Sequence, residues 1–167
     1  MVNGIARYYA PSWAAVRDLH IEVATSIDIA ATADTVWPYL VDWDHLGDWM
    51  LEASAFKVTS ASREGVGVTS EATIKMLGIS ARDAIEVTRW EPPHVLEIAH
   101  LGRVGGSGVM MLSPTSQGCR LDWVETLRPP FGVAGWLSFR LFRWLFRRTF
   151  MRDLRALGRL VEGQIPG

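Results

Sequence analysis

Four polar residues of the sequence lie where alternation predicts the apolar face of a β-strand. Glu125 and His100 share the phase of the large apolar side chains in their segments, and Asp83 and Ser70 do so more weakly. Residues two apart in a strand point to the same face of a sheet, so these side chains are expected to point inward. A carboxylate and an imidazole inside an apolar cup can exchange protons with a substrate or orient a ligand hydroxyl or carbonyl. Glu125 and His100 are therefore our catalytic candidates, and Asp83 and Ser70 are candidates for ligand binding.

A second interpretation of these residues is open. An unpartnered buried polar group costs about 1–3 kcal/mol, so each of them needs a partner or a purpose. Glu125 is close to the end of its segment, where it would pair with an arginine of a covering helix. His100 precedes a glycine-rich segment over 102–108, which places it at a rim or on the surface and marks a flexible hairpin, a candidate gate.

The elements that must position these residues follow from periodicity and turn residues. Alternation predicts one strand at the start of the chain and six after two short helices, with Gly and Pro between the strands. The strands are expected over 22–30, 53–60, 66–77, 81–90, 95–101, 109–112 and 119–127. The two short helices are expected to start near Ala31 and to span 44–50, and a further helix is expected over 12–19.

The C-terminal part of the chain predicts one long helix over 133–162, because it lacks proline and is rich in Leu, Arg, Phe and Ala. At 100° per residue one face gathers large apolar side chains, and that face would pack on the sheet. It contains Phe139, Phe142, Phe146, Phe150, Leu157 and Leu160. Soft or broad side chains suit an adaptable apolar wall, and plain core packing is the alternative for each. The candidates for such ligand contacts are Trp49, Met76, Trp123, Phe139, Phe142 and Phe146.

Metal and cofactor sites are not expected. The single cysteine, Cys119, excludes an internal disulfide and a cysteine-based zinc site, and the four histidines lack paired ligand spacing. No dinucleotide-binding or phosphate-loop motif is present. Because the chain shows no secretory leader and no apolar run of about 18 residues, we expect a cytoplasmic protein.

The order of elements resembles the helix-grip fold, an α+β architecture in which a curved seven-stranded antiparallel sheet wraps a long C-terminal helix. The segment 29–42, IAATADTVWPYLVD, is similar to the opening of START-like (SRPBCC, Bet v 1-like) proteins, in particular their polyketide cyclase/dehydrase branch. The segments 91–96 and 118–123 resemble a turn and the start of the last strand in that branch. We accordingly divide the chain into an N-terminal extension (1–20) and a helix-grip domain (21–163).

The resemblance implies a cavity between sheet and helix, without fixing its use, since the shared motifs specify packing and chain reversal. We favour binding of a small hydrophobic or lipid-like molecule over catalysis; a polyketide aromatase/cyclase or dehydratase using Glu125 and His100 is the alternative.

A third interpretation rests on the end of the chain, where residues 128–167 hold 8 Arg and 2 acidic residues. Helical phase places further large apolar side chains away from the Phe face: Trp136, Leu137, Leu141, Trp144 and Leu145. This surface suits the cavity mouth, packing against a partner subunit in a homodimer or against the N-terminal extension, or peripheral contact with an anionic membrane. Nucleic acid is not expected, because no base-stacking sheet surface is indicated.

Overall fold

The computed structural model describes residues 19–76 and 79–163. The strands are β1 (Ile21–Ile29), β2 (Ala53–Val58), β3 (Thr69–Met76), β4 (Ile79–Glu91), β5 (Val95–His100), β6 (Gly105–Thr115) and β7 (Gly118–Arg128). The helices are α1 (Ala33–Val41), the short 3-10 helix η1 (Leu46–Asp48), α2 (Gly132–Leu141) and α3 (Arg143–Glu162). The helix expected over 12–19 and most of the expected N-terminal extension lie outside the described residues.

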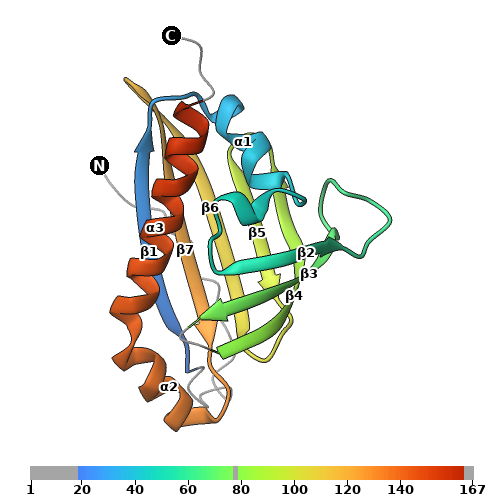
Figure 1. Cartoon of the computed structure of the whole chain (residues 1–167), viewed down its shortest axis with the longest axis vertical. Helices are drawn as coiled ribbons and strands as arrows, with labels where there is room; N and C mark the ends of the chain where they lie inside the picture. The colour runs from blue at the N-terminus through green and yellow to red at the C-terminus, as the bar shows by residue number, and fades with distance from the viewer. Residues whose placement is uncertain (1–18, 77–78, 164–167) are drawn as a thin grey trace, which may run out of the picture.

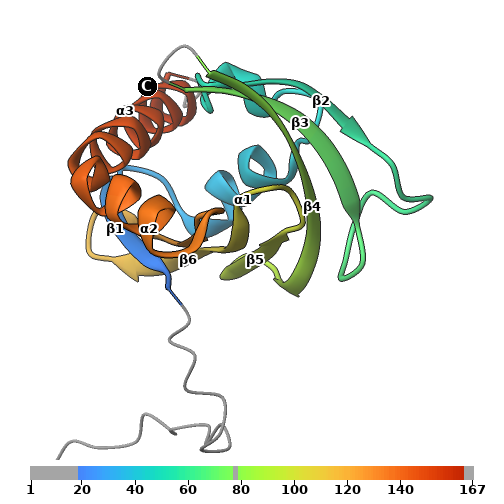
Figure 2. The same cartoon turned by 90° about the horizontal axis from the view of Figure 1, so that it is seen from below.

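One antiparallel sheet of seven strands, in the order β1-β7-β6-β5-β4-β3-β2, forms the body of the protein. The sheet curls around the interior, α3 packs along β1, and α1 lies near one end of α3 (Figures 1 and 2). The expected α+β helix-grip architecture is confirmed. Alternation explains it locally, since every second residue of β7 from Cys119 to Leu127 is buried and the intervening ones are not.

Two expected elements differ in the structure. The glycine-rich segment was expected to be a flexible hairpin, but residues 105–108 form the start of β6 and pair with both neighbouring strands. The second short helix, expected over 44–50, is reduced to the 3-10 turn of η1. The strand expected over 66–77 starts only at Thr69, and Val66 precedes it and is exposed.

The expected single helix over 133–162 is wrong, because the chain forms two helices separated at Phe142 (Figure 1). Phe142 has φ −94° and ψ 10°, outside the helical region, so the helical phase does not continue across it. The apolar face expected to run through Phe142 is therefore interrupted. α3 buries its inner face, whereas α2 buries none of its residues.

The short helix α1 starts as the sequence indicates. The Thr32 hydroxyl accepts a hydrogen bond from the Thr35 backbone N–H (3.3 Å), which satisfies one of the free amides at the helix start. α1 buries Val36, Trp37 and Leu40. No helix within 19–76 and 79–163 is both long and apolar enough to cross a membrane.

Candidate functional site

A cavity of about 350 Å³ lies between the inner face of the sheet and the helices. Most of its wall is apolar, and the lining extends from β2 through β7 to α2 and α3. Its apolar side chains include Leu40, Phe56, Ile74, Ile85, Leu96, Ile98, Met110, Trp123, Phe139, Phe146 and Phe150. Phe139 of α2 stacks on Phe146 of α3, with ring centroids 5.0 Å apart, so the two helices share this part of the wall.

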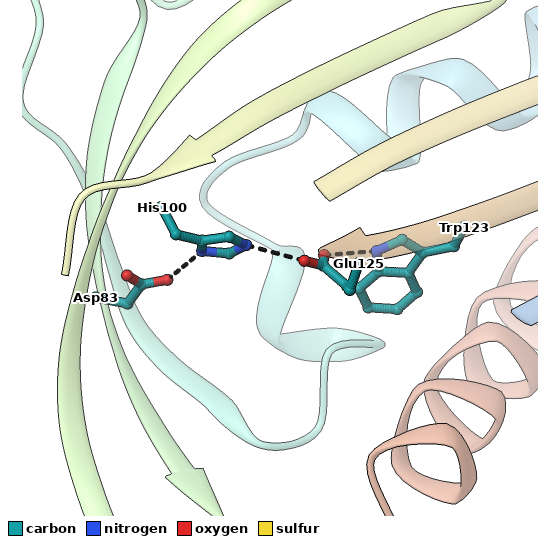
Figure 3. Close-up of polar contacts among 4 residues, drawn as sticks. All are labelled: Asp83, His100, Trp123 and Glu125. Carbon is teal, nitrogen blue, oxygen red and sulfur yellow. Dashed lines mark hydrogen bonds and ion pairs between the residues drawn. The ribbon is translucent and has the colours of Figure 1, made fainter. Parts of the chain in front are cut away.

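Three polar residues of the wall form one hydrogen-bonded group, which we call the histidine cluster: Asp83 (β4), His100 (β5) and Glu125 (β7). His100 Nδ1 lies 2.7 Å from Asp83 Oδ2, and His100 Nε2 lies 3.0 Å from Glu125 Oε2 (Figure 3). The Trp123 indole N–H donates to the other oxygen, Glu125 Oε1, at 2.7 Å. Glu125 thus pairs with His100 and Trp123, not with an arginine of the helix.

The His100 ring of the cluster carries a positive charge inside an apolar cavity. Burial by itself would lower the pKa of His100, but the hydrogen bonds and negative charges of Asp83 and Glu125 outweigh it and raise the pKa to about 10. His100 is therefore an imidazolium at neutral pH, and it donates through both ring nitrogens. Across the described ranges, no group of three or more His, Cys, Asp or Glu side chains has the arrangement of a metal site.

Glycines of β6 make the cluster geometrically feasible. β6 separates β5 from β7, and Gly106 and Gly108 pair with His100 and Glu125 across the two ladders. A Cβ on Gly108 would lie 2.3 Å from Glu125 Oε1, inside van der Waals contact. His100 reaches across β6 to Glu125 because these inward positions carry no side chain.

A second polar group of the cavity wall was missed by the sequence analysis. Glu52, just before β2, and Asp153 of α3 both line the cavity, and we call them the carboxyl pair. The Leu51 backbone N–H donates to Asp153 Oδ1 at 3.3 Å, and Arg152 Nη2 lies 2.5 Å from Glu52 Oε2. A signal was available, because Asp153 is in helical phase with Phe146, Phe150 and Leu157 on the apolar face of α3.

Four of the residues proposed as ligand contacts are not part of the described wall. Trp49 is buried behind it, where its indole N–H donates to the Tyr39 carbonyl (3.2 Å) and its ring packs on Trp123. Ser70 is buried in the core and does not line the cavity; the first residue of β3 that does is Ala72. Phe142 is displaced by the helix break and is 42% exposed. Met76 is the last residue of β3, and its side chain lies outside the described residues.

The mouth of the cavity and the surface of α2 are the remaining places where chemistry-bearing side chains gather. Exposed Arg82 and Arg103 line the cavity. Around α2, large apolar side chains face outward, and Arg140 lies 5.2 Å from the centroid of the Trp136 ring. The exposed ones are Phe131, Val133, Leu137, Leu141, Phe142 and Trp144.

This geometry accompanies a clear family relationship. Residues 20–162 match the model of the family described as polyketide cyclase / dehydrase and lipid transport. The chain belongs to this family. Among curated proteins, this polyketide cyclase/dehydrase family member is 26% identical over 101 residues to an uncharacterised protein of Mycobacterium tuberculosis strain H37Rv, Rv1546, covering 59% of this chain and 71% of that one.

Solved structures share the fold of this family member. TTHA0849 from Thermus thermophilus superposes with a TM-score of 0.75 at 20% identity, covering 87% of this chain and 100% of that one. The Zhui aromatase/cyclase from Streptomyces sp. R1128 gives 0.74 at 17% identity, covering 89% and 97%. The di-domain aromatase/cyclase StfQ of the steffimycin biosynthetic pathway gives 0.73 at 16%, covering 89% of this chain and 53% of that one.

Proposed function

We propose that the protein binds a small, largely apolar molecule in the cavity, with a hydroxyl group of that molecule at the histidine cluster. The observation that carries the proposal is an apolar cavity of about 350 Å³ whose polar groups are few: the histidine cluster, the carboxyl pair and two exposed arginines. Burying about 300 Å² of apolar ligand surface at about 25 cal/mol/Å² gives roughly 7 kcal/mol before association costs. Shape and apolar contact would therefore supply most of the affinity.

The hydrogen bonds of the cluster favour a hydroxyl over a carbonyl. Both N–H groups of His100 and the indole N–H of Trp123 already donate to carboxylates. A carbonyl oxygen would have to displace one of these bonds, whereas the carboxylate oxygens keep free lone pairs for a hydroxyl donor.

Calorimetry with 1-octanol and native mass spectrometry test this function. Protein isolated without detergent should carry an apolar molecule as an added mass, and stripped protein should bind 1-octanol with a negative heat-capacity change. Empty protein after gentle isolation, together with no heat of octanol binding, would contradict the proposal.

Dehydration of a β-hydroxy ketone is the second candidate function, and the bond between His100 and Glu125 is the observation that favours it. Glu125 carboxylate would remove the α-proton while the His100 imidazolium protonates the departing hydroxyl, which leaves as water. The proton on Glu125 then returns to His100 along their 3.0 Å contact. A pKa of about 10 lies above the range that suits proton transfer at neutral pH, so we place binding first.

Substitution of the two residues tests this second candidate. Glu125→Gln and His100→Ala should each abolish turnover of a β-hydroxy ketone substrate while the far-ultraviolet circular dichroism stays unchanged. Unchanged turnover in either folded variant would exclude this assignment.

Contact with an anionic membrane through α2 and the start of α3 is a third candidate, supported by the outward apolar residues beside arginines. Trp144 is 63% exposed, and Arg143, Arg147 and Arg148 are exposed next to it. Trp144→Ser should lower sedimentation with phosphatidylserine vesicles and leave octanol binding unchanged. Equal sedimentation of wild type and variant would contradict this role.

A further inference from the structure

The carboxyl pair holds two of the three buried side-chain polar atoms without a hydrogen-bond partner in the described residues, the third being Ser70 Oγ. Glu52 Oε1 and Asp153 Oδ2 are both buried, and no N–H or hydroxyl group of the described residues contacts either oxygen; the one hydrogen bond open to them is between the two carboxyl groups, which needs a proton on Asp153. The Asp153 side chain is 1% exposed and that of Glu52 is 9% exposed. That hydrogen bond is lost when Asp153 is ionised, and the pair would then bury two acceptors without donors, which is costly.

The other oxygens of the pair are occupied by the protein. Glu52 Oε2 is bound by Arg152, whose side chain is 53% exposed and approaches from the solvent side. Asp153 Oδ1 accepts from the Leu51 N–H, and the Glu52 carbonyl accepts from the Lys75 N–H at 2.7 Å. These contacts fix the backbone at 51–52 against α3 and β3. Holding the elements together thus requires only one oxygen of each carboxyl group.

The charge of the pair is only half neutralised. Arg152, 2.5 Å from Glu52 and 3.7 Å from Asp153, supplies one positive charge for two carboxyl groups. Burial, the hydrogen bond with Glu52 and its negative charge raise the pKa of Asp153 to about 8, against a weaker lowering by the Leu51 N–H and Arg152. At neutral pH a proton on Asp153 therefore offsets the second negative charge of the pair.

The pair is separate from the histidine cluster. Glu52 precedes β2, which is two strands away from the β4 strand that carries Asp83. Asp153 comes from α3, which contributes no residue to the cluster. The remaining charged groups of the cavity wall, Arg82 and Arg103, are exposed.

We propose that Glu52 and Asp153 form a second polar subsite of the cavity that binds the ammonium group of an apolar amine. This inference rests on the proposed binding function and narrows its ligand class to amphiphilic primary amines. An ammonium carries three N–H donors and one positive charge, so it satisfies both free oxygens and neutralises the second carboxylate. A hydroxyl brings one donor and no charge, and would leave Asp153 protonated.

Because the ammonium group and the proton compete for Asp153, the affinity for the amine should depend on pH. Binding of an ammonium requires Asp153 to release its proton, so affinity should rise by up to tenfold per pH unit below about pH 8 and then level off. His100 stays protonated over this range because its pKa is about 10. An alcohol of the same chain length should show neither the pH dependence nor the proton release.

The experiment compares n-octylamine with 1-octanol by isothermal titration calorimetry on the full chain from pH 6 to 9. We expect octylamine to bind about tenfold or more tightly than octanol at pH 8.5, as for a charge-assisted hydrogen bond. We also expect close to one proton released per amine at pH 7, measured in phosphate and in Tris. Equal affinity of the two probes at all pH values would overturn the inference while leaving the proposed function intact; failure of both to bind would overturn both.

Two variants locate the ammonium. Asp153→Asn keeps an acceptor for Leu51 and a donor for Glu52, so it should fold, bind octanol normally and lose the preference for octylamine together with its pH dependence. Asp34→Asn, at an exposed position of α1, makes the same chemical substitution away from the cavity and should behave as wild type. If Glu125→Gln abolishes the preference and Asp153→Asn does not, the ammonium binds at the histidine cluster and the inference is wrong.

Discussion

Gly108 of β6 lies directly opposite Glu125 of β7, and the Glu125 carboxylate occupies the space that a side chain at position 108 would fill. The inward phase of β6 continues through Met110 and Leu112, both buried. Gly108 therefore interrupts the inward apolar residues of β6 at the position that pairs with Glu125, where the carboxylate points toward His100. Taken alone, the glycine-rich segment 102–108 indicates flexibility. In the sheet, its Gly108 leaves space for the Glu125 carboxylate.

Gly108→Ala should disturb the histidine cluster. The added Cβ would lie 2.3 Å from Glu125 Oε1, so the carboxylate must move away from Trp123 or from His100. We expect a loss of about 1–3 kcal/mol in the free energy of unfolding, the usual cost of overpacking. Urea denaturation gives this value, and the ring-nitrogen chemical shifts of His100 report the altered contact.

Gly105→Ala is the matched control for that substitution. It lies on the same strand, and the nearest atom to its added Cβ, the His100 carbonyl oxygen, is 3.8 Å away, an ordinary contact. This variant should unfold close to wild type and keep the His100 shifts. Equal destabilisation by both alanines would mean that this part of β6 tolerates no added side chain, and that contact with Glu125 is not what makes glycine necessary at position 108.

The outcome for these residues shows what alternation can and cannot predict. Parity placed His100, Glu125 and Asp83 on the inner face, because the two-residue period needs no knowledge of neighbouring strands. Their mutual contacts depend on register across three ladders and on the empty positions of β6, which a single segment does not encode. The break at Phe142 was missed for a similar reason, since Phe142 is itself compatible with a helix. Asp153 was overlooked although helical phase placed it among the apolar residues of α3.

Protonation of His100 should persist well above neutral pH. Because its pKa in the folded protein is about 10 and its ordinary value is 6.5, both ring nitrogens should show imidazolium ¹⁵N shifts at pH 8. The folded state binds more protons than the unfolded state between these values. This contribution to stability is fully present below about pH 6.5 and is lost as the pH rises to about 10.

Asp83→Asn tests the cause of that shift. Removing one of the two carboxylates should lower the pKa of His100 and shift the loss of stability to lower pH, while the Nε2 contact with Glu125 remains. A His100 that titrates near 6.5 in the wild type would show that the two carboxylates do not hold the proton.

Filling the cavity should separate ligand binding from stability. Ala72 of β3 is buried and lines the cavity, so Ala72→Leu places three more carbon atoms in empty space. We expect the free energy of unfolding to change by less than about 1.5 kcal/mol and octanol affinity to fall at least tenfold, measured by calorimetry. Ala24→Leu, at an exposed position of β1, is the control and should bind octanol as wild type does. Unchanged affinity of Ala72→Leu would place the ligand elsewhere.

Removing the carboxyl of Asp153 should change how stability depends on pH. The pKa of this group is about 8 in the folded protein against an ordinary value of 3.8, so between these values the folded state binds one proton that the unfolded state has lost. Its contribution is complete below about pH 4 and falls by up to about 1.4 kcal/mol per pH unit as the pH rises to about 8. In Asp153→Asn this decline should be absent. The free energy of unfolding of Asp153→Asn, measured by urea denaturation, should therefore rise relative to that of the wild type from pH 4 to pH 8. That of Asp34→Asn should not. Curves for Asp153→Asn and wild type that run parallel over this range would show that Asp153 is already ionised in the folded protein, in which case Arg152 alone would neutralise the pair.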